Sequence, residues 1–84
     1  MNILEIKELA KKGNALLEEA IINLLKKHPE GLSNSEIARE LNLESSHEGS
    51  QSNYLTYSVL GNLMKQGLVS KQKQSPRSVK FYSI

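Results

Sequence analysis

Residues 31–69 constrain the fold more than any other part of the chain. The segment begins Gly-Leu-Ser-Asn-Ser-Glu-Ile-Ala-Arg-Glu-Leu. Ser33 and Glu36 have the spacing of a capping box, in which each side chain bonds the other residue's otherwise unpaired backbone amide. Apolar residues then recur at the interval that buries one face of a helix, namely Ile37, Ala38 and Leu41. This pattern predicts a short, well-capped helix.

A second helix is predicted over about residues 52–66, after a Ser-rich polar turn. The turn, residues 44–52, is longer than the connection usual between two such helices. Apolar residues at helical spacing predict the buried stripe, which consists of Leu55, Val59, Leu60, Leu63 and Met64. Gly67 is placed to end this helix in the left-handed conformation that glycine adopts without strain.

After Gly67 the pattern changes to that of extended structure. Residues 68–73 and 79–84 favour strands, and residues 74–78, with Pro76 among them, favour a hairpin tip. The chain therefore closes with two short antiparallel strands.

Two helical segments are predicted before residue 31. A short one ends at Gly13, because glycine inside a helix costs about 1 kcal/mol relative to alanine, and Asn14 is placed to cap a new start. The next helix has one apolar stripe, made of Leu16, Leu17, Ala20, Ile21, Leu24 and Leu25. Pro29 bounds it, because the residue before a proline is disfavoured in the helical conformation.

The predicted fold class is mainly α with a small β-hairpin, an α+β architecture. We expect a three-helix domain with a hairpin over residues 14–84. A short helical extension over residues 1–13 would precede it. With 84 residues and a mass of 9.4 kDa the chain has room for one domain.

Composition narrows the class further. The chain has no cysteine, which excludes disulfides and thiol chemistry. Apolar residues make up 38% of the chain and occur in periodic groups, whereas a membrane span needs about 20 consecutive apolar residues. The N-terminus lacks the features of a signal peptide. We therefore expect a cytoplasmic protein with no membrane association.

Charge is distributed unevenly along the chain. The formal net charge is only +2, but residues 52–84 contain five basic side chains and no acid. A local positive field of this kind attracts a polyanion. A surface that merely keeps the protein soluble is the alternative interpretation.

The order of helices and hairpin resembles the winged helix-turn-helix superfamily, including MarR- and ArsR-type transcription regulators. The resemblance covers roughly residues 14–84. It rests on residues 31–41, on Leu60-x-x-Leu63-x-x-Gln66-Gly67-Leu68-Val69, and on Lys80-Phe81-Tyr82-Ser83-Ile84. It implies binding to double-stranded DNA. The chain departs from the family in its longer turn and in the absence of Arg or Lys among the residues that its third helix would present to bases.

In such proteins the third helix enters the major groove, where each base pair shows a distinct pattern of donors and acceptors. The candidate residues at its start are Ser52, Asn53, Tyr54, Tyr57 and Ser58. Asn53 can pair with adenine through two hydrogen bonds, and the tyrosine rings can contact a thymine methyl group. The alternatives are a plain helix cap for Asn53 and core or interface packing for the tyrosines.

The hairpin, residues 70–80, supplies the basic wing. Its candidate residues for the flanking phosphates or the minor groove are Lys71, Lys73, Arg77 and Lys80, since cations there add affinity by releasing counterions. A solvated loop is the alternative. Backbone amides at Ser33, Asn34 and Ser35 are candidates for holding a further phosphate.

Nothing in the sequence indicates an enzyme. The chain has no Asp, no Gly-rich phosphate loop and no nucleophile motif. Its two histidines, His28 and His47, lack metal-ligand spacing. We expect no catalytic residues, no bound metal and no cofactor.

We therefore expect a small transcriptional regulator that binds specific DNA sequences as a homodimer paired through the N-terminal helix. The alternative is a winged-helix module that binds another protein, or an accessory module. Small modules of restriction-modification systems look similar, with a comparable Tyr-Leu-Thr-Tyr start to the third helix. Steep salt dependence of binding to arbitrary duplex DNA would separate the two.

Overall fold

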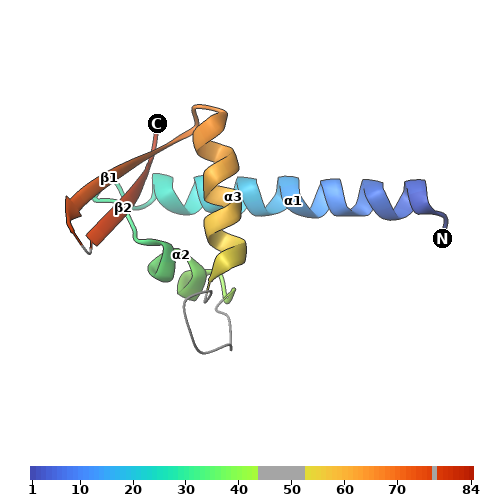
Figure 1. The fold of residues 1–84 in the computed structure, drawn as a ribbon, viewed down its shortest axis with the longest axis horizontal. Helices are drawn as coiled ribbons and strands as arrows, with labels where there is room; N and C mark the ends of the chain where they lie inside the picture. The colour runs from blue at the N-terminus through green and yellow to red at the C-terminus, as the bar shows by residue number, and fades with distance from the viewer. Residues whose placement is uncertain (44–52, 77) are drawn as a thin grey trace.

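The computed structural model describes residues 1–43, 53–76 and 78–84. In these ranges the chain forms three helices followed by an antiparallel hairpin (Figure 1). The elements are α1 (Ile3–Lys26), α2 (Asn34–Glu40), α3 (Tyr54–Lys65), β1 (Val69–Ser75) and β2 (Ser78–Ser83). The predicted mainly helical α+β architecture is confirmed.

Helix α1 is one unbroken helix of 24 residues, so the predicted interruption at Gly13 is wrong. Asn2 caps the helix, with its side-chain oxygen accepting from the Glu5 amide at 2.9 Å. Asn14 does not begin a new helix; its Nδ2 donates to Glu18 Oε1 at 3.0 Å, one turn further along. One glycine costs too little to break a helix that has good helix formers on both sides. The predicted end before Pro29 is confirmed.

The core lies where the C-terminal half of α1 meets α2, α3 and the hairpin. Figure 1 shows α3 crossing α1 at this half, with the hairpin beside it. The core consists of Ile21, Leu25, Leu32, Ile37, Val59, Leu60, Leu63, Val69 and Phe81. Gln66 at the end of α3 also donates from Nε2 to Glu18 Oε2 at 3.1 Å, which ties α3 to α1.

Two leucines that were expected in the buried stripes are exposed. Leu16 is 64% exposed and Leu55 is 50% exposed. Thr56 takes the buried position in α3, with no exposed surface. Because residues advance about 100° around a helix, Thr56 lies on the same line as Val59, Leu60 and Leu63, whereas Leu55 lies a quarter turn away.

Two helices end in left-handed residues. Gly67 follows α3 with a φ of 76°, as predicted, and the Leu68 amide bonds the Leu63 carbonyl at 3.0 Å. Asn42 does the same after α2, with a φ of 56°, and the Leu43 amide bonds the Ala38 carbonyl at 2.7 Å. Both patterns are Schellman motifs, which satisfy the last carbonyls of a helix.

An isolated β-bridge joins the hairpin to the segment between α1 and α2. Leu32 pairs antiparallel with Phe81 through two hydrogen bonds, one from each amide, of 3.1 and 2.8 Å. The paired strands extend further toward the tip than predicted, since β1 reaches Ser75 and β2 begins at Ser78. The register shifts by a bulge between Lys73 and Ser75.

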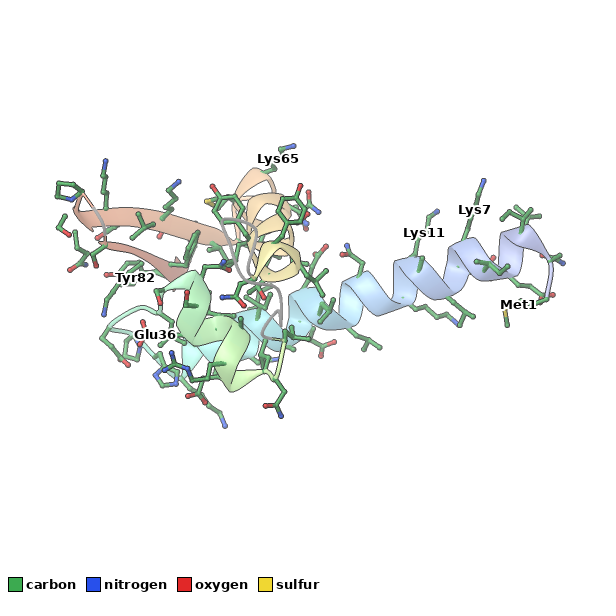
Figure 2. All side chains as sticks on the ribbon, turned by 60° about the horizontal axis from the view of Figure 1, so that its bottom comes forward. Met1, Lys7, Lys11, Glu36, Lys65 and Tyr82 are labelled. Atoms are coloured by element: carbon green, nitrogen blue, oxygen red, sulfur yellow. The ribbon has the colours of Figure 1, made fainter. Side chains whose placement is uncertain are left out.

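The N-terminal half of α1 projects away from the body. Every residue from 1 to 16 is exposed, and the molecule measures 47 Å along its longest axis. Figure 2 shows Met1, Lys7 and Lys11 on this projecting end, far from Glu36 and Tyr82. Within the described ranges, no helix has the length and apolar character needed to cross a membrane.

Candidate nucleic-acid interface

A depression of about 360 Å³ lies between α2, α3 and the hairpin. Five of the predicted site residues line it, and they come from three elements: Ser33, Asn34, Ser35, Tyr57 and Lys71. Phe81 forms part of its apolar lining. The fold thus gathers residues that lie up to 48 positions apart in the sequence, from Ser33 to Phe81.

Next to this depression, α3 presents an exposed polar and aromatic face. Tyr54 is 67% exposed and Tyr57 is 49% exposed, which excludes core packing within one chain as the role of either ring. Ser58 is exposed on the same side. The buried face of α3 is held by the core, so this outer face is the one available to a partner.

Sequence reasoning missed two further residues on the outer face of α3, the half-buried Gly61 and the exposed Lys65. Gly61 and Lys65 continue the line that begins at Tyr54 and Ser58, because these positions are three and four residues apart. Asn62, which the sequence already places off the buried stripe, is also exposed. The buried residues Thr56, Val59, Leu60 and Leu63 lie on the opposite side of α3. The positions of the buried residues in the sequence therefore indicate which residues of α3 face outward.

The start of α3 differs from the prediction. The helix begins at Tyr54 rather than near residue 52, because Asn53 adopts the left-handed conformation with a φ of 63°. The Asn53 carbonyl accepts a hydrogen bond of 3.2 Å from Asn34 Nδ2. Asn34 therefore positions the start of α3 from the first turn of α2. Ser52, like Arg77, lies outside the described residues.

Ser33 is engaged in the predicted capping box, which is confirmed. The Glu36 amide donates to Ser33 Oγ at 3.2 Å, and the Ser33 amide donates to Glu36 Oε1 at 2.9 Å. The hydrogen bond from the Ser33 amide, together with that of its side chain, lowers the pKa of the Glu36 carboxyl. An ionised carboxylate thus accepts from the Ser33 amide at the start of α2, and Ser35 is the exposed member of the serine pair.

The register of the hairpin divides its lysines between two faces. Lys71 pairs with Phe81 and Lys73 pairs with Val79. Since directly paired residues of an antiparallel sheet point to the same side, Lys71 and Lys73 lie on the side of the hairpin that carries the buried Phe81. This is the side of the depression.

Lys80 lies on the other face of the hairpin. It pairs with Gln72, and its positive charge contributes to lowering the pKa of both Glu30 and Glu36. The hydrogen bonds to these carboxyls are the larger causes of both shifts. The structure therefore places Lys80 beside carboxylates and does not bring it together with Lys71 and Lys73.

Among the described residues, no group of three side chains of the metal-binding types lies close together. His28 Nδ1 lies 2.9 Å from Glu30 Oε1. This contact and the backbone hydrogen bond of Glu30, which is the larger cause, lower the pKa of the Glu30 carboxyl. His47 lies outside the described ranges.

No protein-family model matches the sequence, and no curated protein sequence matches it. The crystal structure of the Campylobacter jejuni peroxide stress regulator is similar to this structure, with a TM-score of 0.71 and 18% sequence identity. The match covers 99% of this chain and 58% of the regulator chain. At this identity the likeness establishes the fold alone, which is three helices followed by an antiparallel hairpin.

Proposed function

We propose that this winged-helix chain binds specific sequences of double-stranded DNA and acts as a small cytoplasmic transcriptional regulator, without a cofactor. The observation that supports the proposal most is the depression shared by α2, α3 and the hairpin. It adjoins the exposed face of α3 on one side and Lys71 on the other. A duplex seated there would meet a helix and two basic side chains together.

The exposed face of α3 supplies the chemistry for base contacts. A major groove about 12 Å wide accommodates an α-helix. Ser58 can donate to or accept from base edges, and the rings of Tyr54 and Tyr57 can lie against thymine methyl groups. Asn53, just before the helix, is the proposed contact to adenine. Asn34 fixes the start of α3 by donating a hydrogen bond to the Asn53 carbonyl.

The hairpin supplies phosphate contacts. Lys71 and Lys73 share a face and are exposed, so both can reach the backbone that flanks the groove. Arg77, which lies outside the described residues, and Ser35 at α2 complete the proposed set. Such contacts carry no sequence information, but they fix the orientation of the protein on the duplex.

We also propose that the active form is a homodimer paired through the projecting half of α1. Dimeric helix-turn-helix proteins read two half-sites about one helical turn apart. Exposed apolar side chains along α1, among them Ile6 and Leu9 at 48% and 54% exposure, support such pairing.

A second candidate function is a protein-interaction or accessory module. It is favoured by the apolar character of part of the α3 face, where Leu55 is as exposed as Tyr57. Exposed apolar patches commonly mark protein interfaces. A module of this kind would bind its partner with weak dependence on salt.

Fluorescence anisotropy with an arbitrary labelled duplex separates these two functions. The DNA-binding proposal predicts that affinity falls steeply between about 50 and 200 mM salt, because each phosphate contact releases counterions. Selection from random duplexes then identifies the preferred sequence. Absence of binding to both arbitrary and selected duplexes at low salt would contradict the proposal.

Lys71 and Lys73 supply the proposed phosphate contacts of the hairpin. Replacing Lys71 and Lys73 together by Ala should weaken binding to all duplexes alike. It should also flatten the plot of log affinity against log salt by about one unit for each phosphate that is no longer neutralised. The matched control is the double change of Lys7 and Lys11 to Ala, which removes the same charge from the projecting end (Figure 2). Equal weakening in both variants would mean that net charge alone drives binding.

A further inference from the structure

We propose that the projecting half of α1 pairs with the same segment of a second copy in antiparallel orientation, with a twofold axis between Leu9 and Ala10. This deepens the proposed homodimer, and thus rests on it, by stating which residues face each other. The pairing uses residues 3–16 alone, so it leaves the core and the candidate nucleic-acid interface untouched.

The projecting half has one continuous apolar face. With an advance of about 100° per residue, most apolar residues of this segment fall within less than half of the helix circumference. The residues on this face are Ile3, Ile6, Leu9, Ala10, Gly13 and Leu16. Leu4 and Ala15 lie outside it. Lys7, Glu8 and Lys11 lie outside this face. All these positions are exposed in the single chain.

The exposed area of the projecting helix sets an upper limit on the size of the interface. The chain has 6193 Å² of accessible surface, whereas a compact monomer of 9.4 kDa has about 5,000 Å². The excess is about 1,200 Å², and the apolar face takes less than half of the helix circumference, which leaves about 600 Å² at most for each partner. This is below the roughly 800 Å² of a standard interface and predicts a small, reversible one. The projecting helix is the element that departs from a compact shape (Figure 1).

Gly13 is the residue that points to a closely approaching helix. It costs α1 about 1 kcal/mol relative to Ala, and a Cβ built on it would have no described atom within 4 Å. Packing within the folded monomer therefore does not require a glycine at position 13. A second helix crossing at the usual 8–10 Å would use the space.

Size complementarity favours a copy of the same segment in antiparallel orientation. When the axis lies between Leu9 and Ala10, facing residues have numbers that add up to 19. Ile6 then fills the space over Gly13 of the second copy, Ile3 faces Leu16, and Leu9 faces Ala10. In a parallel pair, by contrast, Gly13 would face Gly13 and leave a void, while Ile6 would face Ile6.

Charge complementarity agrees with this arrangement. Glu5 and Lys12 flank the apolar face on the same side, and in the antiparallel pair Glu5 of each copy lies near Lys12 of the other. Exposed ion pairs of this kind contribute little stability, about 0–1 kcal/mol each. They occur twice by symmetry, and they favour this register over one that brings like charges together.

Disulfide cross-linking tests the orientation directly, because the natural chain has no cysteine. We expect a mixture of the Ile6→Cys and Gly13→Cys variants to form mixed cross-linked dimers on mild oxidation, and we expect neither variant to cross-link alone. Two copies of residue 6 lie about 10 Å apart along the antiparallel axis, too far for a disulfide. Efficient self-cross-linking of Ile6→Cys would overturn the proposal in favour of a parallel pair.

A bulk test provides a second, independent measurement. Gly13→Leu should raise helix propensity yet lower the fraction of dimer in sedimentation at least tenfold, because its side chain collides with Ile6 of the second copy. Ala15→Leu adds a larger side chain on the exposed opposite side and should leave dimerisation unchanged. The exchange Ile6→Ala with Gly13→Ile should restore the dimer. Equal dimerisation of all variants would overturn the proposal.

These measurements use no DNA, so their failure is distinct from failure of DNA binding. If the cross-links fail while the salt-dependent titration succeeds, the antiparallel pairing is wrong and the DNA-binding function stands. If the cross-links form and no duplex binds, the dimer stands and the DNA-binding function is wrong.

Discussion

At the scale of single residues, Gly31 and Tyr82 determine how the hairpin meets the body. Gly31 has a φ of 83°, and a Cβ on it would lie 2.6 Å from Cε1 of the Tyr82 ring. The Tyr82 hydroxyl accepts a hydrogen bond of 2.8 Å from Gln74 Nε2. The ring therefore fits between the turn after α1 and the strand β1, and only glycine leaves room for it.

Gly31→Ala should destabilise the fold by about 2 kcal/mol or more, through the strained backbone and the displaced ring. Gly67→Ala is the matched control, since its φ of 76° is similar but no described atom lies within 4 Å of the added Cβ. It should cost only the conformational part, about 1–2 kcal/mol. Urea unfolding measures both values, and equal destabilisation would show that the ring contact contributes nothing.

Some residues of the site were predictable and others were not, for reasons visible in the helices. Tyr54, Tyr57 and Ser58 could be assigned to the outer face because the buried line of Val59, Leu60 and Leu63 is clear in the sequence. Hydrophobicity misled at Leu55, because position on the helix decides burial and the less apolar Thr56 lies at the centre of the buried line.

At the scale of elements, α2 shows how local sequence fixes a short helix. Seven residues are too few for a stable isolated helix in water, so α2 depends on its capping box and on burial of Ile37 and Ala38. The cap also keeps Asn34 where it holds the start of α3. Loss of the cap would therefore reach the candidate interface.

The cap should make stability depend on pH. The pKa of Glu36 in the folded state lies below its ordinary value of 4.5, so its contribution is complete above about pH 4.5 and is lost as pH falls through the folded-state pKa. Glu36→Gln should flatten the fall in the free energy of unfolding over that acidic range. Glu40→Gln, on the same helix but outside the cap, is the control. Chemical unfolding across this range measures the slopes, and identical slopes in wild type and Glu36→Gln would contradict the assignment.

Elements with a strong local signal were predicted well. The capping box and Gly67 marked the start of α2 and the end of α3, because both act through neighbouring backbone groups. The continuity of α1 through Gly13 could not be predicted from that residue alone, since a cost near 1 kcal/mol does not decide between a break and a long helix. The face of Lys80 depends on the pairing register, which is set by contacts between β1 and β2.

At the scale of the whole molecule, the proposed dimer places the exposed faces of two α3 helices on one duplex. Linking two binding sites raises the overall affinity by about 10²–10⁴ without new contacts. The proposed pairing through α1 and the proposed DNA binding therefore meet in one measurable quantity, the gain from a second half-site.

Gly13→Leu should reduce affinity for a duplex with two half-sites by about 100-fold, because a monomer cannot engage the second half-site through a linked copy. Its affinity for a duplex with one half-site should stay the same, since Gly13 is exposed and lies outside the core that holds α3. Anisotropy titrations at one salt concentration give both values, and Ala15→Leu serves as the control. An equal loss of affinity for both duplexes would indicate damage to the candidate DNA-binding surface around α3.

Because α1 is one unbroken helix, its length and the direction in which its faces point are coupled. One inserted residue lengthens it by about 1.5 Å and at the same time turns everything beyond it by about 100°. Reach and facing direction cannot be adjusted separately in steps of one residue. Insertions of about seven residues come close to preserving the facing direction, and each lengthens the rod by about 10 Å. Variants of this chain that differ in length before the core are thus expected to retain function only at such intervals.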